Sequence, residues 1–280
     1  MQRAESYDET KGGGKQDKVK KHSTILKVLL ILLSVILFVT GAAILAKPTI
    51  NRIEQEVQAK DAVDAFFHDN CYERVPRQET TEAAPVIIRK RENKPEPEET
   101  PYPELLTAMQ DYNEEIYRTK QCGLADPWCY TAPVLELNDF GLTGEAVGVL
   151  TIPAMEFEEL VYLGATADHL ARGAAQLSIS SMPIGGVNTN CVLAGHRGWQ
   201  GALHFRHIEL LEIGDTVILT NLWDVLEYKV TEIKVIHPWQ PEELLIQEGR
   251  DLLTLITCHP YGSGGKYRYV VVCERNNKEN

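Results

Sequence analysis

The sequence has no excess of basic residues. Lys and Arg number 28 against 40 Asp and Glu, which gives a formal net charge of −12 at pH 7. Proteins that bind nucleic acids neutralise phosphates with a basic face, so this balance argues against a nucleic-acid partner. The simpler explanation for a surplus of carboxylates is a soluble domain with an acidic surface.

The sequence also has only one long apolar run. Residues 28–46 are uncharged and almost wholly apolar. As a helix they rise about 28 Å, close to the thickness of the hydrocarbon core of a membrane. We therefore predict a single-pass anchor over residues 24–46. The alternative is a cleaved signal peptide with a small-residue site at residues 41–43, but the apolar regions of signal peptides run only about 7–15 residues.

Charge next to this run predicts its orientation. Under the positive-inside rule, lysines before the run keep the N-terminus in the cytoplasm. Residues 1–23 are therefore predicted to be a cytoplasmic tail, and everything after residue 47 is predicted to lie outside the cell membrane. The lysines that precede or open the run are Lys15, Lys18, Lys20, Lys21 and Lys27.

Residues 47–139 are predicted to form a stalk, an acidic linker and a segment that leads into the main domain. Apolar residues in the first part recur at helical spacing, which indicates a stalk helix. Residues 89–101 carry too much charge and proline to support a core, so we interpret them as a flexible linker. Pro103 then opens an amphipathic helix, in which Leu105 and Ile116 share one apolar face.

Residues 140–280 show short apolar runs separated by turns. Apolar and polar residues alternate over residues 226–230, as is typical of a half-buried strand. The alternation slips by one residue at Glu232 and then resumes, which indicates a β-bulge. Several strands and few helices over ~140 residues predict a mainly β fold, with a closed or nearly closed barrel and short helices.

Three residues with reactive or charged side chains lie at the ends of predicted strands. Cys258 ends an apolar strand just before a Gly-rich loop, Arg268 opens the next strand, and His196 follows a strand over residues 191–194. A thiolate is strongly nucleophilic, and a histidine can protonate a departing amine. A permanently charged guanidinium can hold a developing oxyanion. The three together are typical of thiol-based acyl transfer.

Each of these assignments has a plainer alternative. A cysteine in a strand is commonly a buried core residue. A single histidine among 8 is more often structural than catalytic. Arg197 and Arg206 compete with Arg268 for the oxyanion role, because spacing alone does not separate them.

A metal site is a rival interpretation. His204 and His207 form a His-x-x-His pair, and Cys258 and His259 add further potential ligands. A zinc site requires clear spacing and a third or fourth ligand, which the sequence does not supply. We therefore predict no metal.

Three motifs together resemble the sortase family, the membrane-anchored transpeptidases of Gram-positive bacteria. They are residues 193–198 (Leu-Ala-Gly-His-Arg-Gly), residues 254–258 (Thr-Leu-Ile-Thr-Cys) and Arg268 at the start of the last strand. The resemblance covers about residues 140–276 and implies a closed sortase-type β-barrel. It also implies Cys258 as the nucleophile, His196 as the acid and Arg268 as the oxyanion ligand, with no cofactor and no required metal.

A second resemblance is to class C, the pilus-assembling sortases. Asp126-Pro127-Trp128 precedes the barrel, where class C sortases carry an Asp-Pro-aromatic lid. This resemblance implies that Asp126 faces Arg268 and that Trp128 covers Cys258, although the same tripeptide also makes an ordinary turn. Class C sortases commonly carry a C-terminal membrane helix as well, and this sequence has no second apolar run of that length.

Two cysteines bracket the lid tripeptide. Cys122 and Cys129 lie at a spacing that a disulfide can close, and oxidation is chemically feasible outside the membrane. Such a bridge would fix the shape of the lid. Two free thiols in a reducing niche are the alternative.

The resemblance as a whole implies a membrane-anchored cysteine transpeptidase that acts on surface proteins or pilins with an LPXTG-like sorting signal. Cys258 would cleave between Thr and Gly, and an amine, in class C a pilin lysine, would resolve the thioacyl enzyme. Three alternatives stay open. They are a sortase of another class that attaches proteins to cell-wall precursor, a cysteine hydrolase, and a non-catalytic membrane-tethered binding module.

Overall fold

The computed structural model describes residues 13–76, 86–91, 100–122, 132–198 and 202–276. The chain divides into two units, residues 1–51 and residues 52–280, and each is described by itself. Helix α1 (Gly13–Asp69) contains Pro48 just before the boundary between the units. A proline inside a helix removes one backbone hydrogen bond, so α1 is weakened at this point.

One part of α1 is a candidate membrane anchor. Among the described residues, Leu26–Asp69 is the one helix that is long and apolar enough to cross a membrane, by length and composition. Its most apolar window has a mean hydropathy of 3.0, and none of that window is buried. This candidate lies where the sequence predicts a membrane-spanning segment.

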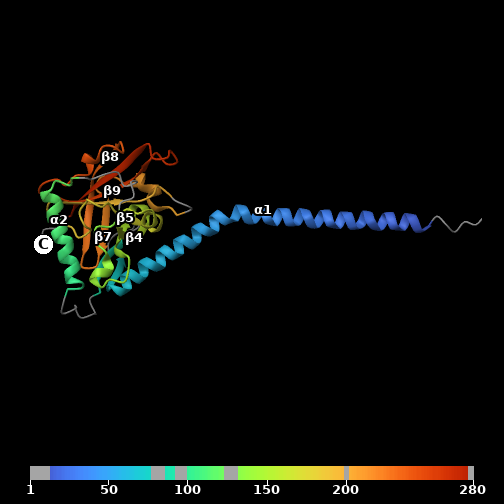
Figure 1. Cartoon of the computed structure of the whole chain (residues 1–280), viewed down its shortest axis with the longest axis horizontal. Helices are drawn as coiled ribbons and strands as arrows, with labels where there is room; N and C mark the ends of the chain where they lie inside the picture. The colour runs from blue at the N-terminus through green and yellow to red at the C-terminus, as the bar shows by residue number, and fades with distance from the viewer. Residues whose placement is uncertain (1–12, 77–85, 92–99, 123–131, 199–201, 277–280) are drawn as a thin grey trace, which may run out of the picture. The chain divides into compact units, whose positions relative to one another are not determined.

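Eight strands of the second unit form a closed barrel (Figure 1). Around the barrel their order is β10-β8-β7-β3-β4-β5-β6-β9, and the pairs β4–β5 and β6–β9 are parallel. The closed, mainly β fold predicted from the sequence is therefore confirmed. The strands are β3 (Ala146–Ile152), β4 (Phe157–Leu163), β5 (Ala174–Gln176), β6 (Thr189–Ala194), β7 (Thr216–Asn221), β8 (Val225–Ile236), β9 (Asp251–His259) and β10 (Tyr267–Arg275).

Short helices connect the strands. A six-residue α-helix joins β4 to β5, and 3-10 helices occupy other connections, as the sequence predicts for a barrel with few helices. They are η2 (Leu137–Phe140), η3 (Pro153–Met155), α3 (Ala167–Arg172), η4 (His204–Leu210) and η5 (Pro241–Leu244).

Two hydrophobic clusters lie on opposite faces of the barrel wall. The larger cluster draws residues from all eight barrel strands and includes Leu255 and Val271. The smaller cluster includes Ile256, which follows Leu255 in β9, and Val270, which precedes Val271 in β10. It also includes Leu244 of η5. Because successive side chains of a strand point to opposite faces, each of these strands supplies both clusters. Both faces of the wall are therefore buried at this part of the barrel.

The predicted bulge in β8 is present. Val272 of β10 pairs with Glu232, but the next residue, Cys273, pairs with Val230. Thr231 is therefore the extra residue in β8, one position before the slip predicted at Glu232. A bulge of this kind shifts the alternation of side chains by one residue, which is the signal that the sequence carries.

A two-stranded sheet corrects the predicted start of the linker. Strand β2 (Val86–Lys90) pairs with β1 (Tyr72–Pro76), so Arg89 and Lys90 belong to a strand and not to a linker. An ion pair of 3.1 Å between Arg89 Nε and Glu73 Oε1 joins the two strands across the register. The positive charge of Arg89 is balanced by Glu73 on the partner strand, so charge here does not indicate an unstructured segment. Residues 92–99 of the predicted linker lie outside the described residues.

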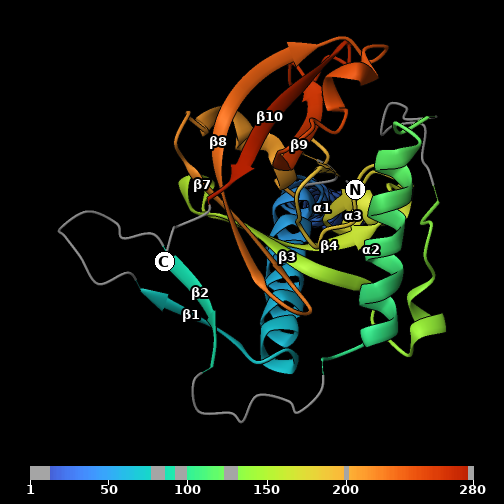
Figure 2. The same cartoon turned by 90° about the vertical axis from the view of Figure 1, so that its left-hand side faces the viewer.

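Helix α2 (Pro103–Arg118) lies along the side of the barrel and confirms the predicted amphipathic helix (Figure 2). Its buried face includes Leu105, Met109 and Ile116. Two hydrogen bonds fix it to the chain before β6. The Met182 N–H donates to Asn113 Oδ1 at 2.7 Å, and the Ile179 N–H donates to the Tyr112 hydroxyl at 3.0 Å.

The bond to Asn113 predicts a measurable loss of stability. The Asn113→Ala substitution leaves the buried Met182 N–H without its acceptor, which costs about 1–3 kcal/mol of the free energy of unfolding. Gln110→Ala, on the exposed face of the same helix, is the matched control and is expected to change little. Urea unfolding of the three proteins measures the difference, and equal stabilities would show that this contact does not hold α2.

Candidate active site

Strand pairing brings Cys258 and Arg268 together. The two residues are direct partners in the antiparallel register of β9 and β10. Opposed residues of an antiparallel pair project their side chains to the same face. The Arg268 guanidinium lies over the thiol, with Nη1 3.8 Å from Cys258 Sγ.

A second, parallel pairing brings His196 to the same end of the barrel. The last paired residues of β6 and β9 are Ala194 and Ile256, and the Gly195 N–H extends the ladder by donating to the Ile256 carbonyl at 3.2 Å. His196 lies two residues beyond Ala194, just as Cys258 lies two residues beyond Ile256. The ends of three adjacent strands, β6, β9 and β10, therefore carry the histidine, the thiol and the guanidinium.

These three side chains differ in exposure. Cys258 is half-buried, whereas His196 is 8% exposed and Arg268 is 5% exposed. Burial, followed by a smaller electrostatic effect of the neighbouring His204, lowers the pKa of His196 to about 4. The imidazole is therefore neutral at neutral pH and able to accept a proton from a thiol.

The backbone around Gly265 shapes the space between thiol and guanidinium. Arg268 Nη1 donates to the Gly265 carbonyl at 2.6 Å and to the Tyr267 carbonyl at 3.1 Å. A Cβ on Gly265 would lie 2.9 Å from that nitrogen and 3.1 Å from Cys258 Sγ, and the residue has a φ of +82°. The sequence shows a Gly-rich loop here, but it does not show that this particular glycine lies against both groups.

The structure separates Arg268 from its two competitors. Arg197 is buried and binds elsewhere, with Nη2 2.6 Å from Glu209 Oε2 and Nη1 2.8 Å from His259 Nδ1. The Arg197 guanidinium also holds the pKa of Glu209 below its usual range. Arg206 lies over the Tyr261 ring, 4.4 Å from its centroid. Neither guanidinium has the contact with the thiol sulfur that Arg268 has.

The proposed ligands of a metal site do not converge. Within the described ranges, no three or more His, Cys, Asp or Glu side chains are grouped so that they could hold a metal ion. His204 Nδ1 instead lies 3.0 Å from both carboxylate oxygens of Glu159, and His207 is exposed. Nδ1 of His259 is in contact with Arg197 Nη1 and is therefore not free to bind a metal.

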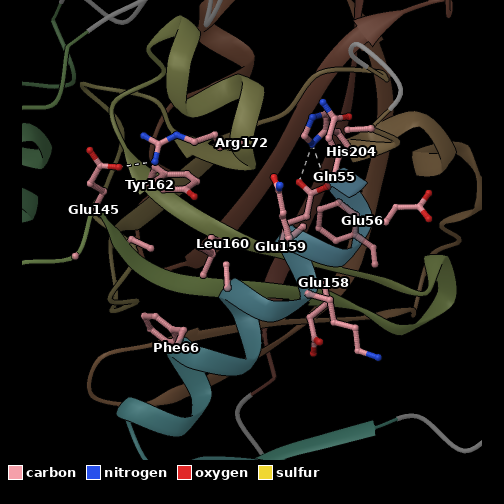
Figure 3. Close-up of a pocket in the computed structure, with 18 of the residues that line it drawn as sticks. Gln55, Glu56, Phe66, Glu145, Glu158, Glu159, Leu160, Tyr162, Arg172 and His204 are labelled. Atoms are coloured by element: carbon pink, nitrogen blue, oxygen red, sulfur yellow. Dashed lines mark hydrogen bonds and ion pairs between the residues drawn. The ribbon is translucent and has the colours of Figure 1, made fainter. Parts of the chain in front are cut away.

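A separate cleft lies between α1, β4 and η4 (Figure 3). It has a volume of about 1160 Å³, and none of Cys258, His196 and Arg268 lines it. Its walls include the Glu159 and His204 pair, which is joined by dashed lines in Figure 3. The cleft is therefore next to the candidate site but does not contain it.

The remaining sequence-predicted site residues stand as follows. Asp126, Trp128 and Cys129 lie outside the described residues, so the lid and the disulfide stay predictions. Cys122 is described and exposed. Cys191 and Cys273 are core residues, and burial raises the pKa of both thiols.

Comparisons with known proteins agree with this geometry. A family model for the sortase domain matches residues 150–276. Sortase D of Bacillus subtilis (strain 168) is 30% identical over 135 residues, which are 48% of this chain and 65% of that protein. The chain thus spans a little less than two thirds of this curated relative.

The matches to solved structures cover a larger share of the matched protein than the match to sortase D does. Sortase C1 of Streptococcus agalactiae, in complex with MTSET, has 31% sequence identity and a TM-score of 0.57, and the match covers 62% of this chain and 89% of that chain. Sortase C-1 of Actinomyces oris has 30% identity and a TM-score of 0.54, with coverage of 62% and 98%. Both similarities are strong enough in sequence and shape to indicate common descent.

The contact between Arg268 and the thiol predicts how fast Cys258 reacts. A guanidinium 3.8 Å away stabilises the thiolate, so Arg268→Gln is expected to slow alkylation by iodoacetamide at neutral pH. A change of one pKa unit corresponds to about tenfold in rate. Mass spectrometry of the peptide that contains Cys258 measures this rate without interference from the other cysteines.

The control for this experiment is Arg206→Gln. Arg206 contacts Tyr261 and not the sulfur, so its loss is expected to leave the alkylation rate unchanged. Equal slowing in both variants would show that general charge, and not the Arg268 contact, governs the thiol.

Proposed function

This chain belongs to the sortase family, and we propose that it is a membrane-anchored cysteine transpeptidase with Cys258, His196 and Arg268 as its catalytic residues. The observation that carries the proposal is the geometry at the ends of β6, β9 and β10, where the guanidinium lies 3.8 Å from the thiol sulfur. The three groups are a nucleophile, a proton carrier and a fixed positive charge.

The first half of the proposed reaction forms a thioester. Cys258 Sγ attacks the carbonyl carbon between Thr and Gly of an LPXTG-like sorting signal, and the thiol proton passes to neutral His196. The tetrahedral oxyanion is stabilised by Arg268, whose charge does not depend on protonation. The C–N bond then breaks, and the His196 imidazolium gives its proton to the departing glycine amine.

The second half transfers the acyl group to an amine. The incoming amine attacks the thioester carbonyl and loses a proton to His196, and the proton returns to the Cys258 sulfur as the C–S bond breaks. A low pKa suits His196 to both halves, because the ring starts each half neutral and its imidazolium is a strong acid. No metal or cofactor is needed in this scheme.

The proposed acceptor is a lysine amine of a pilin, and the product is an isopeptide-linked polymer. This part rests on the similarity to solved class C enzymes, among them sortase C1 of S. agalactiae. Proposed partners are thus LPXTG-bearing surface proteins or pilins. The apolar segment of α1 would anchor the enzyme in the cell membrane, with the N-terminus in the cytoplasm and the barrel outside.

A second candidate is a sortase of another class, which would attach surface proteins to cell-wall precursor. This candidate stays open because a relative of this chain, sortase D of Bacillus subtilis, is not named as a class C sortase. Supplying the acyl enzyme with a lysine-bearing pilin and with a peptidoglycan amine in parallel separates the two candidates, because the preferred acceptor forms the dominant covalent product.

The transpeptidase proposal predicts a trapped covalent intermediate. The full-length protein in detergent is incubated with an LPXTG peptide, quenched with acid and analysed by intact mass. The expected result is an added mass equal to the acyl group that ends at Thr, which is the peptide fragment through Thr minus one water, and this adduct is absent in Cys258→Ala. The Asp126→Ala/Trp128→Ala variant is run beside it so that a covered thiol does not give a misleading blank.

Several sorting motifs are tested in the same way. An adduct in either protein supports the transpeptidase, and resolution of that adduct by water alone favours a hydrolase. Peptide binding with no adduct under any condition would overturn the catalytic proposal in favour of a binding module.

A further inference from the structure

The strand beside the nucleophile ends just before it reaches Cys258. Strand β6 pairs with β9 as far as Ala194 and Ile256, and the Gly195 N–H extends this ladder by donating to the Ile256 carbonyl. Backbone groups of a strand alternate between its two sides, so the Cys258 carbonyl, two residues further on, points to the same side as that of Ile256. Because β6 ends at Ala194, it provides no strand beside this carbonyl.

The side chain of Arg197 lies where a longer β6 would run. In a continued parallel ladder, the backbone N–H that follows that of Gly195 on the side of β9 is that of Arg197. The guanidinium of this same residue provides a donor there, with Nη1 3.4 Å from the Cys258 carbonyl oxygen. A side chain thus contributes at Cys258 the kind of contact that the backbone of β6 contributes at Ile256.

Three further contacts hold the guanidinium of Arg197. Its Nη1 donates to His259 Nδ1 at 2.8 Å, and its Nη2 lies 2.6 Å from Glu209 Oε2. A guanidinium has donors only, so His259 Nδ1 is the acceptor and the ring hydrogen is on Nε2. The guanidinium also lies over the Tyr269 ring, 5.6 Å from its centroid. These partners come from β9, η4 and β10, so the position of the Arg197 side chain is defined from several sides.

The charge of Arg197 is balanced by Glu209. The Arg197 side chain is only 4% exposed, whereas that of Glu209 is 52% exposed. A buried charge persists when it has a partner of opposite charge and acceptors for its hydrogen bonds. Paired in this way, Arg197 is not a free cation for an oxyanion, and its contribution at Cys258 is geometric.

We propose that Arg197 is a positioning residue for Cys258, because its guanidinium fixes the backbone at the end of β9 and so keeps the thiol in register with Arg268. The proposal deepens the function proposed above and rests on it for its catalytic meaning. It gives a role to an arginine that the sequence presents only as a competitor of Arg268.

The effect on the thiol follows from the pairing of β9 with β10. Cys258 and Arg268 are opposite one another in this pair, and Arg268 Nη1 lies 3.8 Å from the sulfur. The interaction of two charges weakens with distance, so movement of the end of β9 relative to β10 weakens the stabilisation of the thiolate. Strand β10 holds Cys258 on one side, and Arg197 holds it on the side where β6 has ended.

The test compares two substitutions of Arg197 in the full-length protein in detergent. Arg197→Gln removes both the charge and the fork of nitrogens, whereas Arg197→Lys keeps the charge on a single nitrogen that cannot replace the two terminal nitrogens. Both substitutions are expected to slow alkylation of Cys258 by iodoacetamide at neutral pH by about tenfold, which corresponds to one pKa unit in the thiol. The matched control is Arg250→Gln, which removes an ion pair with Glu274 next to the other end of β9 and is expected to leave the rate unchanged.

Substitutions of His259 test the same geometry without altering Arg197. His259→Asn keeps an acceptor oxygen near the position of Nδ1, whereas His259→Ala removes the acceptor. The expected result is that His259→Ala slows alkylation about threefold and that His259→Asn stays within about twofold of the parent rate, since one hydrogen bond contributes less than the whole fork. This pair of variants keeps the proposal testable if the Arg197 variants do not fold.

Formation of the acyl enzyme is expected to slow together with alkylation. In single-turnover reactions with an LPXTG peptide, the maximal rate in Arg197→Gln is expected to fall about tenfold while the half-saturating peptide concentration stays unchanged, because the contact places the reacting sulfur and does not bind substrate. A purely structural role for Arg197 would lower the melting temperature without slowing either reaction of the folded protein.

The outcomes separate this inference from the proposed function. An unchanged alkylation rate in folded Arg197→Gln overturns the role of Arg197, and so does equal slowing in Arg250→Gln. Full recovery of the rate in Arg197→Lys would show that charge alone matters and would also overturn the geometric role. Slowed alkylation in both Arg197 variants of a protein that forms no acyl enzyme supports the positioning of the thiol and overturns only the proposed function.

Discussion

The candidate site depends on one constraint, the register of three neighbouring strands. Cys258 and Arg268 are paired across β9 and β10, and the parallel pairing of β6 with β9 brings His196 to the same level. A slip of one residue in either ladder would turn a side chain to the opposite face of the wall. The two hydrophobic clusters oppose such a slip, because each strand buries one set of side chains on each face.

A buried arginine strengthens this register at the end of β9. Arg197 follows His196 in the chain, and its Nη1 reaches the Cys258 carbonyl at 3.4 Å and His259 Nδ1 at 2.8 Å. Its other terminal nitrogen pairs with Glu209 of η4, so one guanidinium joins the histidine turn, the thiol strand and that helix. A charge buried to this extent persists only with partners on several sides, and here those partners are the elements that must stay aligned.

The sequence carries more signal for the candidate site residues than for the contacts around them. Cys258, Arg268 and His196 are candidates from sequence because each interrupts or ends an apolar strand, and the bulge in β8 is predictable because it shifts an alternation. The contacts of Arg197, Gly265 and His204 are not predictable in this way. Each depends on contacts between segments far apart in the chain, such as His204 with Glu159, and local pattern carries no signal for these. The strand at Arg89 was missed for the same reason, because its charge is balanced by Glu73 on the partner strand.

The site combines two kinds of positive charge that have to be kept apart. Arg268 is permanently charged, so it favours both the thiolate and an oxyanion without any proton transfer. His196 has to change charge during each half of the proposed reaction, and a ring already protonated at rest has no capacity to take up the thiol proton. Burial lowers the pKa of this ring to about 4, so the ring is neutral at rest. Arg268 is similarly buried but permanently charged, and the carbonyls of Gly265 and Tyr267 accept its hydrogen bonds. The same low exposure therefore leaves one side chain neutral and the other charged, because a guanidinium is a far stronger base than an imidazole.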